Sequence, residues 1–380
     1  MYPRIRECLT DFMDHLERLA QKRAEINLKD MYGNYTMDVI ATTAFATNTD
    51  VHKSLDNPFV VNARNLLNLN PIKRIALLML PSVLQQLFGL SQSESREFFV
   101  RSIRQIMANR KKIEAKKYND FLQLLIDCEK QNDIIRDEND KLDSHHINEG
   151  EEELSAEKKA LNINIVDKHL TDNEVMAQAI VFLLGGYETT SNLLSFCSYE
   201  LALNPHIQDI LCNEINCAID SNGEIPYEVL AKLPHLDAVI SETLRLHSPF
   251  LRLSRLATTD YPLADTGITL RAGQQIDFPI QAIHRSEEYY ENAHQFNPDR
   301  FMPENRHKII PYTYLPFGAG PRNCIGMRFA LLNAKLALAH IVKNYTFFPT
   351  PNTDRPIHYM RGILNLTFPQ KLIVGIDKRC

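Results

Sequence analysis

Tryptophan is absent from this chain of 380 residues, and glycine and proline are sparse, with 13 and 19 copies. The absence of tryptophan excludes every motif that depends on an indole side chain. The low glycine and proline content, together with 44% hydrophobic residues, argues against disorder and leaves enough apolar material for a large core. The sequence therefore predicts a folded, globular chain.

The cysteines provide no framework for disulfides or zinc. There are seven of them, an odd number, and no two form a CxxC pair. Disulfide-rich secreted domains and zinc sites both have a different pattern of paired cysteines. The cysteine content therefore indicates a reducing compartment.

Long hydrophobic segments are also missing. Arg4, Arg6 and Glu7 interrupt the apolar run that a signal peptide would need. The most apolar later stretch, residues 75–90, contains Pro81 and is shorter than the roughly 20 apolar residues of a membrane span. We therefore expect no transmembrane helix within this sequence.

The formal net charge of −5 gives no indication of nucleic-acid binding, so we expect no nucleic-acid partner.

The sequence does contain helical periodicity over most of its length. Apolar residues that recur every three to four positions predict helices at residues 4–29, 30–46, 92–117, 121–130, 171–203, 206–220 and 234–246. Shorter apolar or alternating runs predict strands at residues 251–256, 268–270, 275–279, 346–348 and 371–376. Thr171 and Glu174 are spaced as a capping box, as are Ser91 and Glu94. The predicted fold class is mainly α with small β-sheets, in a single domain over residues 1–380.

One segment departs from this pattern. Between Glu129 and Lys159 there are eleven acidic but only five basic residues, and few large apolar side chains. Such a composition favours solvated chain over packed structure. We expect residues 129–169 to form an acidic, flexible insertion before the long helix that starts near Thr171.

The most informative stretch is a glycine-rich loop that delivers Cys324 to the start of another helix, which we expect from Gly326 towards Tyr345. Gly318 and Gly320 can adopt backbone angles closed to other residues, so the chain can approach a flat cofactor closely. A cysteine just before a helix N-terminus is favoured as the thiolate, the form that ligates iron. A lone cysteine is otherwise usually a buried structural residue.

Three further patterns are ambiguous by themselves. Gly185 and Gly186 lie in the middle of the helix expected at 171–203 and cost it roughly 2 kcal/mol relative to alanines, which either a bound ligand or a close helix contact would offset. Glu242 and Arg245 lie on one helix face, a spacing that usually gives a solvated ion pair worth less than about 1 kcal/mol. Arginines in the segment after Pro249 can be surface charge or partners of an anion.

The loop resembles the haem-binding signature of cytochromes P-450, Phe-x-x-Gly-x-Arg-x-Cys-x-Gly. The matching residues are Phe317, Gly320, Arg322, Cys324 and Gly326. In that family a cysteine thiolate is the axial ligand of haem iron. Stretches such as residues 37–40 and 119–124 are similar to the animal branch that oxidises drugs and other xenobiotics. The resemblance implies haem, an iron protoporphyrin, with Cys324 as the metal ligand and Phe317 shielding its sulfur.

The resemblance also implies roles for residues outside the loop. Thr189 and Glu188 match the pair that helps to deliver protons to iron-bound dioxygen. Arg300, in the Pro-x-Arg-Phe segment at 298–301, would join Glu242 and Arg245 in a buried structural triad. The cofactor-binding set would comprise Arg255 and Arg322 on the propionates together with Phe317, Gly318, Gly320, Gly326 and Gly185. Leu184, Phe250 and Leu251 would line the substrate pocket, and Arg252 would be surface charge.

Family members begin with a membrane-anchoring helix, a small sheet and several helices, one of which carries a Trp-x-x-x-Arg motif. This chain contains no tryptophan. The resemblance therefore implies a cytochrome P-450 fold that lacks its N-terminal anchor, first sheet strands and first helices, an incomplete haem-thiolate monooxygenase domain. The full-length protein would lie on the cytoplasmic face of the endoplasmic reticulum membrane. Residues 75–90 would be a peripheral membrane contact or a buried core segment.

The function implied is insertion of one oxygen atom of O2 into a small apolar substrate, with electrons from an NADPH-dependent reductase. A haem-thiolate isomerase, which needs no proton delivery to dioxygen, is disfavoured by the intact segment from Gly185 to Thr189. A non-catalytic, truncated haem-binding remnant is the remaining alternative. The missing Trp-x-x-x-Arg motif favours it, and the intact downstream motifs oppose it.

Overall fold

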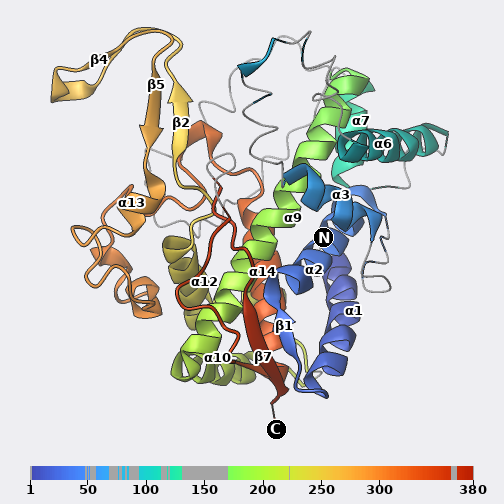
Figure 1. Cartoon of the computed structure of the whole chain (residues 1–380), viewed down its shortest axis with the longest axis vertical. Coiled ribbons are helices and arrows are strands. Elements are labelled where there is room, and N and C mark those ends of the chain that lie inside the picture. Colours follow the sequence, from blue (N-terminus) through green and yellow to red (C-terminus); the bar gives the residue numbers. More distant parts are fainter. Residues whose placement is uncertain are drawn as a thin grey trace.

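The computed structural model describes residues 2–47, 57–67, 94–112, 120–130, 170–221, 223–360 and 366–379, with positions 49, 51, 76, 79–81, 84 and 118 between them (Figure 1). Residues 129 and 130 belong to a helix. The rest of the insertion expected at 129–169 lies outside the described residues, as do Ser91 and most of residues 75–90.

The described part is mainly helical with small antiparallel sheets, as the sequence predicted. The helices are α1 (Tyr2–Ala20), α2 (Leu28–Phe45), α3 (Pro58–Leu67), α6 (Glu94–Lys112), α7 (Phe121–Lys130), α9 (Asp172–Leu203), α10 (Pro205–Ala218), α11 (Tyr227–Leu230), α12 (Pro234–Leu246), α13 (Ile280–His284) and α14 (Met327–Asn344). The strands are β1 (Glu25–Asn27), β2 (Leu253–Leu256), β3 (Tyr261–Pro262), β4 (Thr269–Leu270), β5 (Gln275–Phe278), β6 (Tyr345–Phe348) and β7 (Ile373–Lys378).

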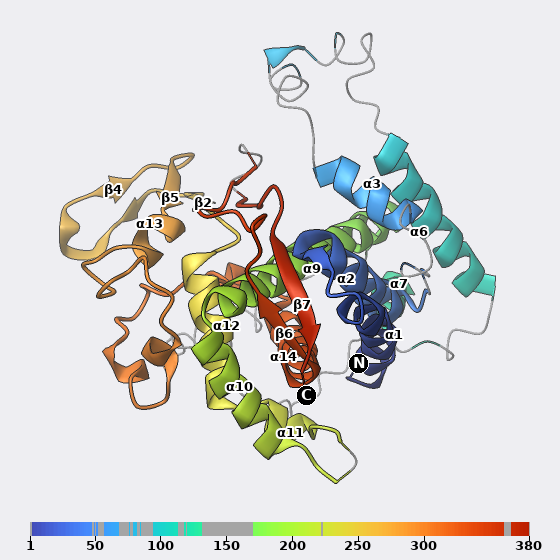
Figure 2. The ribbon, with the colours of Figure 1, turned by 60° about the horizontal axis from the view of Figure 1, so that its bottom comes forward.

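The largest sheet joins the two ends of the chain. Its strand order is β1-β7-β6, all antiparallel, with Ile26 opposite Val374 and Phe347 opposite Ile376. Figure 2 shows β6 and β7 side by side in red. The single helix expected over residues 4–29 is therefore wrong at its C-terminal end, because the pairing with β7 makes residues 25–27 a strand. Two ribbons, β2 with β5 and β3 with β4, form the other sheets.

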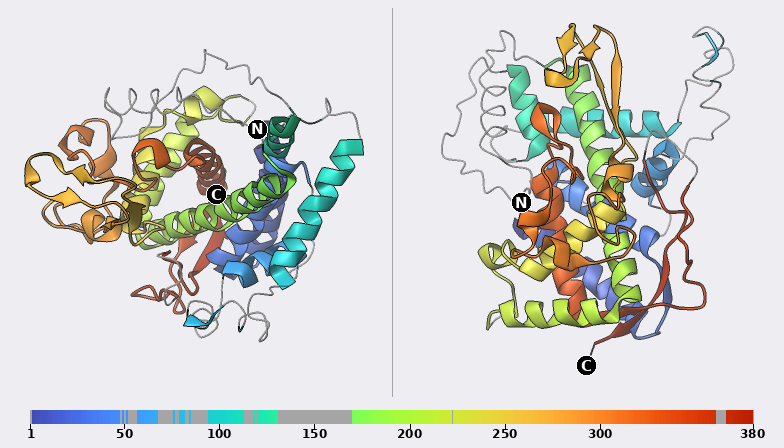
Figure 3. Two further views of the ribbon diagram at one scale, coloured as in Figure 1. Left: turned by 90° about the horizontal axis from the view of Figure 1, so that it is seen from above. Right: turned by 90° about the vertical axis from the view of Figure 1, so that its left-hand side faces the viewer.

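Helix α9 is the centre of the molecule. It contacts α2, α6, α7, α10, α12 and α14, and the left view of Figure 3 shows it crossing between the blue N-terminal helices and the red C-terminal helix. From Tyr187 onwards nearly all of its side chains are buried, as expected for a helix surrounded by other elements. The capping box at its start is confirmed, because the Thr171 side chain accepts from the Glu174 backbone and the Glu174 carboxylate accepts from the Thr171 backbone.

Two hydrophobic clusters form the core. One joins α1 to the C-terminal half of α9, to α10, α12, α14 and the large sheet. The other joins α3, α6, α7 and the C-terminal half of α2 to the N-terminal half of α9. Phe329, in the first turn of α14, packs against both clusters. The start of α14 therefore lies where the two halves of the core meet, and the Cys324 loop leads directly into it.

Candidate functional site

The Cys324 loop is shaped by two glycines in the left-handed region. Gly318 and Gly320 both have φ near +75°, which a residue with a Cβ rarely adopts. After them the chain makes a short 3₁₀ turn, Gly320–Arg322, and reaches Cys324, whose backbone N–H donates to the Phe317 oxygen at 2.9 Å. The loop thus folds back on itself and presents Cys324 three residues before α14 begins.

The thiol of Cys324 is exposed. The protein atoms gathered around the sulfur nevertheless raise the pKa of the thiol above its ordinary value, and a hydrogen bond from the Gly326 backbone acts in the opposite direction. This differs from the expectation that the helix N-terminus alone would favour a thiolate, because desolvation outweighs the hydrogen bond. Coordination to a metal displaces the proton of a cysteine ligand and so supplies the missing stabilisation.

The loop lies against strand β2. A Cβ built on Gly318 would stand 3.4 Å from Leu253 Cδ1, and the same strand carries Arg255. Arg322 is exposed and Arg255 is half-buried, and Arg255 Nη1 donates to the neighbouring Ser254 oxygen at 3.0 Å. Arg252 instead pairs with Asp277 across the ribbon, Nη1 to Oδ2 at 3.2 Å. Arg252 and Arg255 therefore have different partners in the structure.

The two glycines of α9 have different surroundings. A Cβ on Gly186 would stand 2.7 Å from Ile40 Cδ1, so close packing of α9 on α2 explains this glycine. A Cβ on Gly185 would meet no atom of the described residues within 4 Å. Thr189 Oγ1, one turn further, donates to the Gly185 oxygen. Contact with α2 therefore explains the glycine at position 186 but not the one at position 185. At Gly185 no described side chain covers the helix backbone.

Glu188 faces α2 and is buried, with 5% of its surface exposed. Lys29 Nζ lies 3.3 Å from its Oε1, and Asn192 Nδ2 donates to the same oxygen at 3.4 Å. Lys29 is in turn held by the Pro369 oxygen at 3.2 Å and lies over the Phe368 ring. Sequence reasoning missed Lys29, because nothing in its local sequence indicates a partner on a distant helix.

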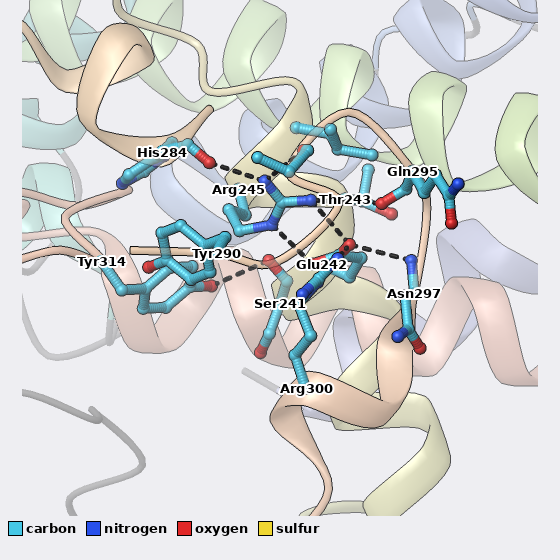
Figure 4. A network of polar contacts seen from close by, with 12 residues as sticks. Ser241, Glu242, Thr243, Arg245, His284, Tyr290, Gln295, Asn297, Arg300 and Tyr314 are labelled. Carbon is cyan, nitrogen blue, oxygen red and sulfur yellow. Dashed lines mark hydrogen bonds and ion pairs between the residues drawn. The ribbon is translucent and has the colours of Figure 1, made fainter. Parts of the chain in front are cut away.

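Glu242, Arg245 and Arg300 meet in the core (Figure 4). Arg245 and Glu242 are fully buried and paired by two hydrogen bonds, Nε to Oε2 at 2.7 Å and Nη2 to Oε1 at 2.8 Å. Arg300 Nε lies 3.5 Å from Glu242 Oε1, and the Asn297 backbone donates to that oxygen at 2.8 Å. The solvated ion pair that the spacing alone suggested is excluded.

The expected pocket residues are placed by long-range contacts. Phe250 forms an antiparallel bridge with Leu366, and the Thr367 backbone donates to the Pro249 oxygen at 3.0 Å. Leu251 is partly exposed. Leu184 packs against the cluster that Phe329 also contacts. The structure thus brings the segment before β2 to the C-terminal segment, a pairing that local sequence patterns do not indicate.

Comparison with known proteins identifies the family. A model of the family Cytochrome P450 matches residues 1–374. The chain belongs to the cytochrome P450 family. It is 34% identical to Cytochrome P450 3A28 of Bos taurus over 381 residues, 98% of this chain and 68% of the bovine protein. It is 35% identical to Cytochrome P450 3A12 of Canis lupus familiaris, over 98% of this chain and 69% of the canine protein.

A cytochrome P450 is a haem-dependent monooxygenase, and the haem iron of this family is held by a cysteine thiolate. The residues present fit that group. Cys324 presents an exposed thiol on a loop of positive-φ glycines, and Gly185 leaves backbone open on α9. Two guanidinium groups are at hand, that of Arg322, which is exposed, and that of Arg255, which is half-buried. Within the described ranges, no helix of this cytochrome P450 is long and apolar enough to cross a bilayer.

Proposed function

We propose that this chain, as one haem-thiolate domain, binds haem through Cys324 and inserts one oxygen atom of O2 into a small apolar substrate. The electrons would come from an NADPH-dependent reductase, and the protein would work at the cytoplasmic face of the endoplasmic reticulum membrane. The observation that carries the proposal is the placement of Cys324: its thiol is exposed, while the backbone of its loop is fixed by the hydrogen bond to Phe317 and by two positive-φ glycines.

Each part of the loop has a task in holding the cofactor. Bound haem supplies an iron centre that activates dioxygen, with a thiolate ligand that favours O–O cleavage. Gly318, Gly320 and Gly326, with Gly185 on α9, keep the adjoining space free of side chains. Phe317 packs against the core, and its ring would limit the access of water to the sulfur once haem is bound. Arg255 and Arg322 would pair with the two propionates, since anionic carboxylates need guanidinium donors.

Proton supply falls to Thr189 and Glu188. The Thr189 hydroxyl, which donates to the Gly185 oxygen, can turn to a ligand beside α9 without moving the helix, because a hydroxyl rotates freely. Glu188 is an acid–base group next to it in sequence, and Lys29 holds its carboxylate on the α2 side. Glu188 would take up a proton from water and release it towards α9, and the Thr189 hydroxyl would donate to the ligand there.

The substrate class follows from the side chains assigned to the pocket. Leu184, Phe250 and Leu251 are apolar and offer no hydrogen bonds from their side chains, so they favour a small apolar molecule bound by burial of surface.

The reduced, carbon-monoxide-bound difference spectrum tests the proposal. The full chain is expressed with haem supplied, as wild type, as Cys324→Ser, and as Cys217→Ser, which removes another exposed thiol. We expect a strongly red-shifted Soret band in the wild type and in Cys217→Ser, and its loss in Cys324→Ser. A band that survives in Cys324→Ser, or no band in the wild type, would contradict thiolate ligation by this residue.

A further inference from the structure

His284 connects the buried ion pair to the Cys324 loop. Its side chain is fully buried at the end of α13, and its backbone oxygen accepts from Arg245 Nη1 at 2.6 Å (Figure 4). Its ring accepts, at Nε2, the backbone N–H of Leu315 at 2.8 Å. The ring also stacks on Tyr314, with centroids 5.6 Å apart. One residue therefore contacts the ion pair through its main chain and the segment before the loop through its side chain.

Two further backbone hydrogen bonds connect Leu315 to Cys324 through the loop. The Leu315 oxygen accepts from the Gly318 N–H at 3.1 Å, and the Phe317 oxygen accepts from the Cys324 N–H at 2.9 Å. Pro316, between them, fixes its own φ and restricts the conformation of Leu315. A shift of Leu315 therefore displaces the loop as a unit instead of being absorbed by one flexible residue.

The ring has the protonation state that this contact requires. Only an unprotonated Nε2 can accept a hydrogen bond, so the geometry assigns the proton to Nδ1. Burial lowers the pKa of His284 to about 3, and the charge of Arg245, on the neighbouring helix, and that of Arg285, the next residue, act in the same direction. The ring of Tyr314, which is uncharged, stacks on the imidazole of His284.

Two other side chains hold the same segment further from the loop. Tyr290 Oη donates to the Thr313 oxygen at 3.0 Å, and Tyr314 Oη donates to the Ser241 oxygen at 3.1 Å. Both contacts precede Leu315 in the chain. His284 is thus the contact nearest to the loop among these three, and it acts on a backbone donor, which an apolar residue could not satisfy.

We propose that His284 is a positioning residue, which holds the Cys324 loop on the Glu242–Arg245 ion pair by accepting the Leu315 N–H and so fixes the position of the cysteine sulfur for haem. The spectroscopic part of this inference rests on the proposed function. The structural part, the hydrogen bond itself, does not need haem.

The test uses the full chain with and without haem. His284→Leu removes the acceptor at similar size, and His284→Gln places a carbonyl oxygen near the position of Nε2. His340→Leu, a partly buried imidazole on α14 away from the loop, is the matched control. Amide hydrogen exchange is followed at Leu315, Gly318 and Cys324 without haem, and the red-shifted carbon-monoxide band is measured with haem.

We expect His284→Leu to speed exchange at these three amides by about tenfold or more, corresponding to about 1.4 kcal/mol of local stability. The fraction of haem that gives the red-shifted band should fall with it. His284→Gln should restore most of both signals, and His340→Leu should change neither. Unchanged exchange in His284→Leu, or no rescue by His284→Gln, would overturn the proposal. If wild type itself gave no red-shifted band, the proposed function would fail, and hydrogen exchange would still decide the role of His284.

Discussion

Lys29 on α2 and Glu188 on α9 form a nearly buried ion pair, with Nζ 3.3 Å from Oε1 and exposed side-chain fractions of 15% and 7%. The pair joins the residue assigned to proton supply to the helix that packs most extensively against α9. Lys29 also reaches the C-terminal segment through the Pro369 oxygen. Three segments far apart in sequence thus converge on one carboxylate.

Removing one partner of this pair should cost more than removing both. Lys29→Met leaves a buried carboxylate without its cation, and we expect a loss of about 3 kcal/mol in the free energy of unfolding. Lys29→Met with Glu188→Leu replaces both charges by apolar groups and should recover most of that loss. Urea unfolding of Lys29→Met, of Glu188→Leu and of the double variant gives the coupling energy between the two residues. Additive losses would contradict a direct pair. The double variant should fold stably but oxidise substrate more slowly than wild type, because it lacks the carboxylate of Glu188. This result would separate the role of Glu188 in folding from its role in proton supply.

Gly185 and Gly186 offer a matched test of two kinds of glycine. Alanine at either position gains about 1 kcal/mol of helix propensity. At Gly186 the new Cβ would stand 2.7 Å from Ile40 Cδ1, and such overpacking costs about 1–3 kcal/mol, whereas at Gly185 no described atom lies within 4 Å. We therefore expect Gly185→Ala to unfold at higher urea concentration than Gly186→Ala and to bind haem more weakly than wild type. Equal midpoints for the two variants would contradict this assignment.

Local sequence patterns predicted the elements whose ends carry local signals. The helix expected at residues 234–246 has those bounds as α12, because Pro234 begins it and the turn at His247 ends it. The strand Glu25–Asn27 was missed because only its pairing with β7, at the other end of the chain, makes it a strand. Tertiary context overrode the helical periodicity there.

The candidate site also contains residues that local sequence patterns indicate and residues that only long-range contacts reveal. The glycine-rich loop and the helix with two glycines were recognisable from the sequence. The triad was expected only from the family resemblance, and the structure brings Glu242, Arg245 and Arg300 together. Lys29 and His284 were not recognisable, since each acts on a partner in another segment and neither lies in a motif. The assigned chemical roles of the loop, the arginines and the Thr189–Glu188 pair remain predictions.

The arginines assigned to the haem propionates can be tested against a neighbour. Arg255→Leu or Arg322→Leu removes a charge-assisted hydrogen bond worth about 1.5–3 kcal/mol, so haem should dissociate about tenfold faster or more. Arg252→Leu is the control, because Arg252 pairs with Asp277. Transfer of haem to a haem-free globin measures the dissociation rate. A faster rate in Arg252→Leu, or an unchanged rate in both of the others, would contradict the assignment.

His284 should make the stability of the chain depend on pH in a defined direction. Its pKa is lowered to about 3 in the folded chain, chiefly by burial, from the ordinary value of 6.5. The unfolded chain therefore binds a proton between these values that the folded chain does not bind, so stability is present above about pH 6.5 and is lost as the pH falls below it. From about pH 7.5 to about pH 5.5 this residue should remove about 1.4 kcal/mol from the free energy of unfolding.

The comparison with His284→Gln isolates that contribution, because glutamine does not titrate and keeps an acceptor for the Leu315 N–H. Urea unfolding of both proteins at the two pH values cancels the titration of every other group that the substitution leaves unchanged. Wild type should lose about 1.4 kcal/mol relative to His284→Gln on acidification. A constant difference between the two proteins would mean that His284 takes up a proton in the folded chain, and a protonated ring cannot accept the hydrogen bond that holds Leu315.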